Sequence, residues 1–77
     1  MEQQNIKARG FEILKTGRRL RGLTQIEVAE TYGINSKTYQ RWERGSTAVS
    51  YDDLTAICEL VFKIPVTDVK KAVSYTQ

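Results

Sequence analysis

The chain has 77 residues, of which 40% are hydrophobic, and its formal net charge is +3. This length fits one small globular domain, and the hydrophobic content excludes a disordered chain. No apolar run approaches the ~18 residues of a membrane-spanning helix, and the polar N-terminus is unlike a signal peptide, so we expect a cytoplasmic protein without a membrane partner. The sequence has no histidine and one cysteine, Cys58, which excludes a zinc site and an internal disulfide, and we expect no cofactor.

The positive charge is concentrated in the first part of the chain. Residues 1–44 contain nine Lys and Arg against five Asp and Glu, whereas residues 45–77 contain three against four. A basic region favours a polyanionic partner, which is either nucleic acid or an anionic membrane surface.

Apolar residues recur at steps of three and four, and no segment alternates as a strand would, so the pattern predicts an all-α fold of five short helices. The first helix is expected over residues 6–21, with Gly22 placed to end it. Gly10 and Gly17 lie inside this helix, where each costs ~1 kcal/mol relative to alanine. Its apolar positions are Ile6, Ala8, Phe11, Leu14 and Leu20.

The next two helices are separated by a short turn. Thr24 and Glu27 have the spacing of a capping box, which predicts the start of the second helix. Gly33 can adopt the left-handed conformation that reverses the chain after this helix. Asn35 is a favourable N-cap for a third helix, over residues 36–44.

Two further helices are expected. Ser50 is placed to cap the fourth, and Asp52 and Asp53 in its first turn interact favourably with the helix dipole. The fourth helix has an apolar stripe of Leu54, Ile57, Cys58, Val61 and Phe62. Pro65 is tolerated in the first turn of a fifth helix. The inner face of that helix is expected to be Val66, Val69 and Val73.

The third helix has two different faces. At about 100° per residue, its polar side chains fall within one arc, whereas Tyr39 and Trp42 fall on the opposite side and are expected to pack in the core. Arg and Lys can donate to the O6 and N7 of guanine, and Gln can bond bidentately to adenine. The residues of this polar arc are Ser36, Lys37, Gln40, Arg41 and Arg44.

Residues 23–45 contain the spaced pattern L-T-Q-x-x-x-A-x-x-x-G-[IV]-[SN]-x-x-T-x-x-x-W-E-x-G. This pattern resembles the helix-turn-helix of lambda-type phage repressors and Cro proteins, the XRE-type family. The resemblance covers roughly residues 11–70 and places the helix-turn-helix at about 24–43. The matching residues are Leu23, Thr24, Gln25, Ala29, Gly33, Ile34, Asn35, Thr38, Trp42, Glu43 and Gly45.

The resemblance implies roles in DNA binding for residues of the third helix. The base-reading positions of the family are matched by Ser36, Lys37, Gln40 and Arg41. Thr38 and Arg44 match positions that often contact the DNA backbone. Tyr39 departs from the family pattern, which has a branched aliphatic residue there, and this leaves open a tilted helix or a hydroxyl that reaches a phosphate.

The resemblance also implies roles for residues outside the third helix. Gln25 matches a glutamine that contacts a phosphate and braces the recognition helix. Glu43 matches a glutamate that pairs with an arginine of the first helix, and Arg18 is at the matching position. For Arg19 and Arg21, phosphate contacts and an ordinary solvated helix end both remain open.

These features predict a non-enzymatic transcriptional regulator that binds double-stranded DNA in a bacterial or phage-infected cell. We expect a phage- or prophage-type repressor that acts as a homodimer on a pseudo-palindromic operator. A DNA-binding antitoxin, a restriction–modification controller and an activator remain alternatives. No enzyme motif is present, and no small-molecule ligand is expected.

The chain is expected to form one domain over residues 1–77, with flexible ends at residues 1–8 and 74–77. Because no separate dimerisation domain is apparent, the fourth helix, the fifth helix or the tail would have to supply the dimer contact. The apolar residues available there are Val66, Val69, Val73 and Tyr75.

Overall fold

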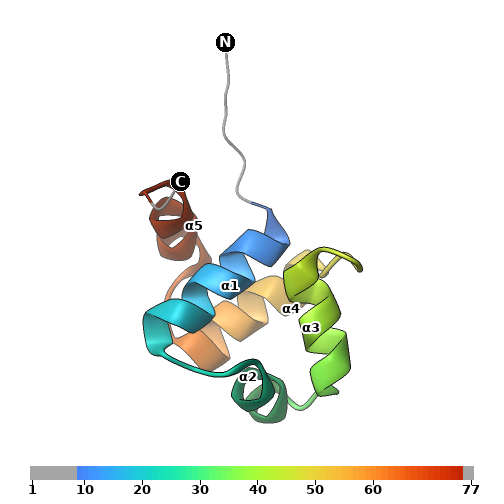
Figure 1. Ribbon diagram of the computed structural model, residues 1–77. Helices are drawn as coiled ribbons and strands as arrows, with labels where there is room; N and C mark the ends of the chain where they lie inside the picture. Colours follow the sequence, from blue (N-terminus) through green and yellow to red (C-terminus); the bar gives the residue numbers. More distant parts are fainter. Residues whose placement is uncertain (1–8, 76–77) are drawn as a thin grey trace.

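The computed structural model describes residues 9–75, which contain helices and no strand (Figure 1), so the all-α prediction is confirmed. The elements are α1 (Gly10–Arg21), α2 (Gln25–Tyr32), α3 (Ser36–Arg44), α4 (Tyr51–Ala56), the π-helical segment η2 (Ile57–Phe62) and α5 (Val66–Tyr75). The helix extends two residues into the tail that was expected to be flexible. The expectations for residues 1–8, including Ile6 and Ala8, and for residues 76–77 lie outside the described residues. No helix within residues 9–75 is long and apolar enough to cross a membrane.

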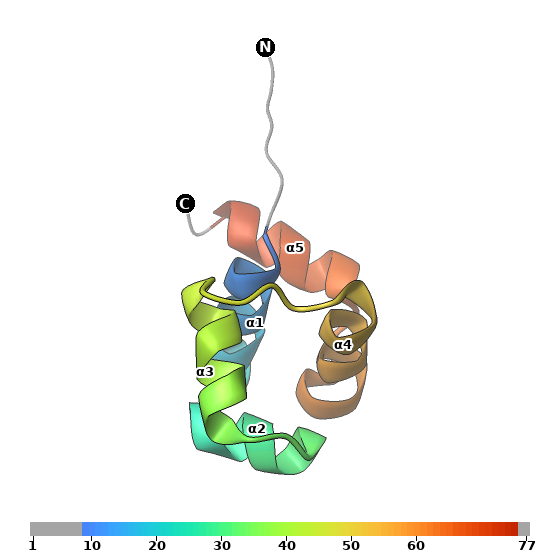
Figure 2. The same ribbon diagram turned by 90° about the vertical axis from the view of Figure 1, so that its right-hand side faces the viewer.

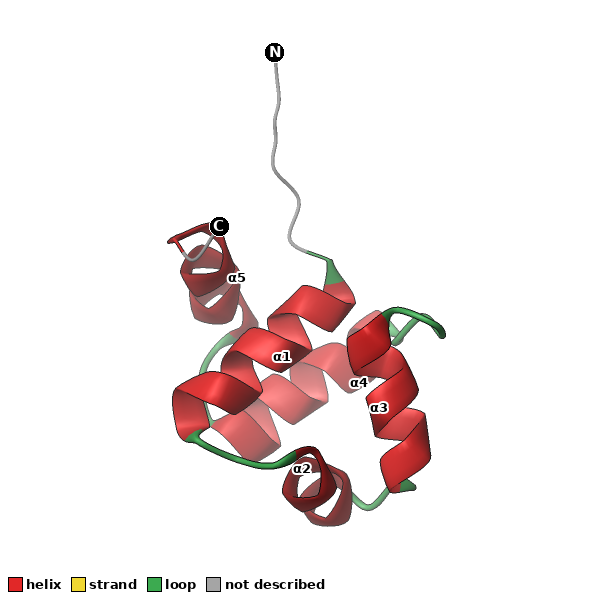
Figure 3. Ribbon diagram, viewed as in Figure 1, coloured by secondary structure: helices red, strands yellow, loops and turns green. Residues whose placement is uncertain are grey.

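The central helix is α1, which packs against α3, α5 and η2. Seen from two directions, α3 and α5 lie on different sides of α1, and α2 closes one end of the bundle (Figures 1 and 2). Short loops join the helices, and the longest of these, residues 45–50, links α3 to α4 (Figure 3). This arrangement leaves one side of α3 at the edge of the molecule.

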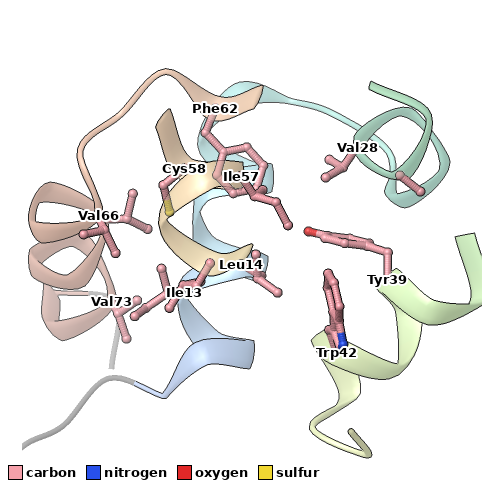
Figure 4. Packing of buried hydrophobic residues seen from close by; sticks show 13 residues of the cluster. Ile13, Leu14, Val28, Tyr39, Trp42, Ile57, Cys58, Phe62, Val66 and Val73 are labelled. Atoms are coloured by element: carbon pink, nitrogen blue, oxygen red, sulfur yellow. The ribbon is translucent and has the colours of Figure 1, made fainter. Parts of the chain in front are cut away.

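The core is a single cluster of side chains from every helix (Figure 4). The predicted inner face of α5 is confirmed, because Val66, Val69 and Val73 are 8%, 0% and 2% exposed. The same burial shows that the expectation of a dimer contact through these valines was wrong, since they are already packed against their own chain. The buried apolar residues are Ile13, Leu14, Val28, Ala29, Tyr39, Trp42, Leu54, Ile57, Cys58, Phe62, Val66, Val69 and Val73.

Local capping sets the boundaries of the helix-turn-helix. The backbone N–H of Glu27 donates to Thr24 Oγ1 at 3.0 Å, and the backbone N–H of Thr24 donates to Glu27 Oε1 at 2.8 Å, so the predicted capping box is confirmed. Gly33 ends α2 with φ of 89°, a left-handed conformation that favours glycine. Asn35 Oδ1 accepts from the backbone N–H of Lys37 at 2.8 Å and caps α3.

The fourth helix differs from the expected continuous α-helix, because it changes to π-helical geometry at Ile57. The wider turn points Ile57, Cys58 and Phe62 into the core, whereas Glu59 and Leu60 face outward. The segment ends at Lys63, a non-glycine residue with φ of 58°. The wide turn was missed because apolar periodicity does not distinguish one π-helical turn from a continued α-helix.

The last turn of α1 is joined to this segment in two ways. The guanidinium of Arg21 donates from Nε to the carbonyl oxygen of Phe62, and from Nη2 to that of Lys63 at 3.3 Å. One turn earlier, Gly17 is buried beneath the Phe62 ring, and a Cβ atom at this position would lie 2.6 Å from Phe62 Cε2. The glycine that weakens α1 by propensity is therefore required by packing against η2.

We predict that Gly17→Ala lowers the free energy of unfolding by about 1–3 kcal/mol, because the added methyl group overlaps the Phe62 ring. Alanine is the better helix former by ~1 kcal/mol, so propensity alone predicts the opposite sign. Urea denaturation followed by circular dichroism measures the sign of the stability change and so distinguishes the packing argument from the propensity argument. In a Phe62→Leu background, the same change should cost less because the ring is gone. A stabilised Gly17→Ala single variant would contradict the packing argument.

Candidate nucleic-acid interface

The exposed side of α3 carries the polar residues that the helical wheel places together. Lys37, Arg41 and Arg44 are exposed, and Ser36 and Gln40 are partly exposed. Thr38 is also partly exposed. The helix α3 lies at the edge of the molecule (Figure 2). Because α3 is continuous, the residues of its polar arc lie along one side of it. We call this surface, Ser36, Lys37, Gln40, Arg41 and Arg44, the α3 arc.

The chemistry of the α3 arc suits the major groove of DNA. An α-helix with its side chains is about 10–12 Å in diameter, and the major groove is about 12 Å wide and admits an α-helix. Three cationic side chains and one carboxamide give donors for guanine and adenine edges, and the same cations can neutralise phosphates. The first turn of α3 contains no acidic residue that would repel a polyanion.

The opposite side of α3 is anchored by a buried ion pair. Arg18 Nε donates to Glu43 Oε2 at 2.7 Å, and Arg18 Nη2 donates to Glu43 Oε1 at 3.0 Å, a bidentate arrangement. Gln25 Nε2 donates to Glu43 Oε1 at 3.1 Å, and Arg18 Nη1 donates to the carbonyl oxygen of Leu23 at 3.0 Å. Because Glu43 is only 2% exposed, this network joins α1, α2 and α3 inside the protein.

The network keeps both charges at neutral pH. Burial alone would raise the pKa of Glu43, but interactions with Arg18, with the neighbouring Tyr39 hydroxyl and with Gln25, together with the guanidinium charge, lower it below its ordinary value. The hydrogen bond to Glu43 raises the pKa of Arg18 in turn. The carboxylate therefore remains ionised and holds α3 through charge-assisted bonds.

Tyr39 occupies the interior, and its hydroxyl does not reach the surface. The residue is 0% exposed, and its ring extends from α3 into the core toward Ile57 and Leu14 (Figure 4). Burial, and then the neighbouring Glu43 carboxylate, raise the pKa of the hydroxyl, and in the described part of the chain Oη makes no hydrogen bond of good geometry. Full burial excludes the option that this hydroxyl contacts a phosphate.

The remaining predicted site residues lie outside α3. Gln25 is partly exposed, and its carboxamide is bonded to Glu43, as expected for a residue that braces α3. Arg19 is exposed in the last turn of α1. Arg21 is in the same turn, and its guanidinium is bonded to the carbonyl groups at the end of η2. The structure therefore engages the guanidinium of Arg21 within the protein and leaves Arg19 exposed.

Sequence reasoning missed a second contact that positions the helix-turn-helix. The hydroxyl of Tyr32 donates to Asp53 Oδ1 at 2.6 Å and joins the end of α2 to the start of α4. Asp53 was recognised only as a favourable residue for the helix dipole. Its partner is 21 positions away in the chain, so no local spacing signals the bond.

We predict that Tyr39→Phe leaves the free energy of unfolding unchanged or raises it by about 1 kcal/mol, because it removes a buried hydroxyl without a partner. The matched control is Tyr32→Phe, which removes a hydroxyl bonded to Asp53 and should cost about 1 kcal/mol. Urea denaturation measures both. A loss of stability in Tyr39→Phe as large as that in Tyr32→Phe would contradict the assignment.

We predict that Glu43→Gln lowers the free energy of unfolding at neutral pH by about 3 kcal/mol, because it leaves the guanidinium of Arg18 without its counter-charge. The control is Glu30→Gln, an exposed carboxylate on α2, which should change stability by less than about 0.5 kcal/mol.

We also predict how the difference in unfolding free energy between wild type and Glu43→Gln depends on pH. Because the folded-state pKa of Glu43 is lowered, the carboxylate contributes stability above its ordinary pKa of about 4.5, and this contribution is lost as the pH falls through the folded value. The stability difference between wild type and Glu43→Gln should therefore shrink below about pH 4.5. A constant difference across the acid range would show that the ion pair does not contribute as described.

The family assignment agrees with this geometry. A family model described as helix-turn-helix matches residues 14–68, which run from α1 into α5 and include the whole α3 arc. No curated protein matches the chain. The match covers well over half of the sequence and includes both partners of the Arg18–Glu43 pair. The chain therefore belongs to the XRE-type, lambda-repressor- and Cro-like helix-turn-helix family of DNA-binding regulators.

Proposed function

We propose that this protein is a sequence-specific regulator of transcription that places α3 in the major groove of double-stranded DNA. The observation that carries this proposal is the α3 arc, a polar and cationic surface on a helix whose other side is anchored by a buried ion pair. A fixed helix presents its donors in one geometry, and this is what base recognition requires. The proposed setting is the bacterial cytoplasm, and the proposed role is that of a phage- or prophage-type repressor.

The proposed contacts divide by chemistry. Base edges are read by Ser36, Lys37, Gln40 and Arg41 from the first two turns of α3. Phosphates are contacted by Arg44 and Thr38 on the same helix, with Gln25 and Arg19 as further backbone contacts. Arg21 is left out of the proposed interface, because its guanidinium is bonded to the carbonyl groups of Phe62 and Lys63.

A dimer is part of the proposal. One recognition helix makes too few contacts for tight binding, and two copies on a pseudo-palindromic operator would double them. The two α3 helices would then enter successive major grooves about one turn, ~34 Å, apart. The burial of the α5 valines means that another surface must join the two copies.

We predict that Arg41→Ala and Arg44→Ala weaken DNA binding in different ways. If Arg41 reads a guanine, its loss should cost ~1–3 kcal/mol on the specific site and relax the preference at one base pair. If Arg44 contacts a phosphate, its loss should weaken all sequences about equally and reduce the log–log salt slope by about 1. Fluorescence anisotropy with specific and scrambled duplexes, over a salt series, separates these effects.

Lys71→Ala is the matched control, because Lys71 is an exposed cation on α5, a helix that lies away from α3 (Figure 1). Its affinity for both duplexes should equal that of wild type. If all three variants lost affinity equally, net charge alone would account for binding, and the assigned roles in α3 would be wrong.

A further inference from the structure

We propose that a cavity between the start of α1, the end of α3 and the loop before α4 binds a small aromatic carboxylate. The cavity has a volume of about 230 Å³. We call it the α1–α3 cavity, and its lining consists of residues 9–11, Trp42, Gly45 and residues 47–49. The proposal concerns a second site on the protein and does not depend on DNA binding.

Two glycines bring the walls of the α1–α3 cavity together. The start of α1 lies beside the loop that links α3 to α4 (Figures 1 and 2). A Cβ atom at Gly10 would lie 2.7 Å from Val49 Cγ1, and one at Gly45 would lie 3.3 Å from Phe11 Cδ1. Each glycine backbone is therefore packed directly against the opposite wall. A site whose walls are already in contact loses less entropy when a ligand binds.

The indole of Trp42 supplies a hydrogen-bond donor without an acceptor. Trp42 is only 9% exposed, and within residues 9–75 its N–H makes no hydrogen bond. Figure 4 shows the indole nitrogen on the side of the ring that faces away from Tyr39 and Leu14. Unlike Tyr39 Oη, this nitrogen is not sealed from solvent, and the residue lines the cavity. Because a buried indole N–H usually has a partner, an oxygen atom of a ligand would complete the site.

The charges around the cavity favour a negatively charged ligand. The exposed guanidinium of Arg9 is part of the lining. Gly10 and Phe11 are the first two residues of α1, and backbone N–H groups at these positions have no acceptor within the helix. The positive end of the helix dipole adds to the same potential. The carboxylate of Glu12 accepts from the backbone N–H of Arg9 at 3.0 Å and does not line the cavity.

The apolar part of the lining favours a flat ring. Phe11 and Trp42 contribute aromatic side chains, and aromatic rings pack favourably in offset or edge-to-face arrangements. Ala48 and Gly45 are small and leave the space between these rings open. Sites for drug-sized ligands begin near ~300 Å³, so this cavity suits a single ring with one carboxylate. Inorganic phosphate would satisfy the donors but leave the aromatic walls uncovered.

A second hollow on the molecule lacks this combination. It is lined by Glu59, Lys63, Ile64 and Pro65, and its volume is about 410 Å³. None of these residues is aromatic, and the carboxylate of Glu59 would repel an anion. No small-molecule ligand was expected from the sequence, because the walls of the α1–α3 cavity come from segments that are distant in the chain.

Nuclear magnetic resonance of the full ¹⁵N-labelled chain tests the proposal with benzoate as the probe. Trp42 is the single tryptophan, so its indole N–H gives one cross-peak that needs no further assignment. We expect this peak and the backbone peaks of Gly10 and Phe11 to shift saturably, with a Kd of about 0.1–1 mM. Benzyl alcohol, which keeps the ring, and acetate, which keeps the charge, should each bind at least about tenfold more weakly.

A pair of charge-removing variants locates the bound carboxylate. Arg9→Gln should weaken benzoate binding about tenfold, because it removes the cation of the lining. Lys71→Gln is the matched control, since Lys71 is an exposed cation on α5 that does not line the cavity, and it should bind benzoate as wild type does. The dispersion of the same spectra shows that both variants are folded.

Three results would overturn the proposal. The first is the absence of a saturable shift of the indole peak up to about 10 mM benzoate. The second is equal affinity for benzoate and benzyl alcohol, which would remove the role of the charge. The third is an equal loss of affinity in Arg9→Gln and Lys71→Gln, which would show a response to net charge alone. Because no arm contains DNA, failure of the proposed function leaves these results unchanged.

Discussion

The buried ion pair between Arg18 and Glu43 is the interaction on which the arrangement of this protein depends. Burying two charges costs several kcal/mol per ion unless hydrogen bonds satisfy both groups. Here the guanidinium also bonds the carbonyl oxygen of Leu23, and the carboxylate also accepts from Gln25. Because these four residues lie on or beside α1, α2 and α3, the orientation of α3 is defined relative to both preceding helices.

This anchoring lets one short helix perform two tasks. The inward side of α3 contributes Tyr39, Trp42 and Glu43 to the interior, and its other side is left for a partner. No residue of the α3 arc is fully buried, so these side chains are available for contact with DNA. A second consequence concerns assembly: the apolar side of α5 is buried in the monomer core, so Val66, Val69 and Val73 are not free to contact a second copy.

The features that follow from local spacing could be predicted from the sequence. The Thr24–Glu27 capping box, the turn at Gly33 and the two sides of α3 depend on neighbours within a few residues, so their signals are contiguous. The π-helical turn, the packing of Phe62 over Gly17 and the Tyr32–Asp53 bond depend on contacts between distant segments. Helical periodicity specified which side of α5 is apolar, but only the folded chain shows that this side is covered.

The central claim is that the anchored α3 helix reads DNA sequence. Selection of duplexes from a random pool at one stated salt concentration tests this claim most directly. The account predicts enrichment of a motif with two inverted half-sites whose centres lie about one helical turn apart. Enrichment by wild type but not by Glu43→Gln, measured under conditions where that variant remains folded, would tie recognition to the buried pair. A wild-type pool that stays as random as the input would contradict the account.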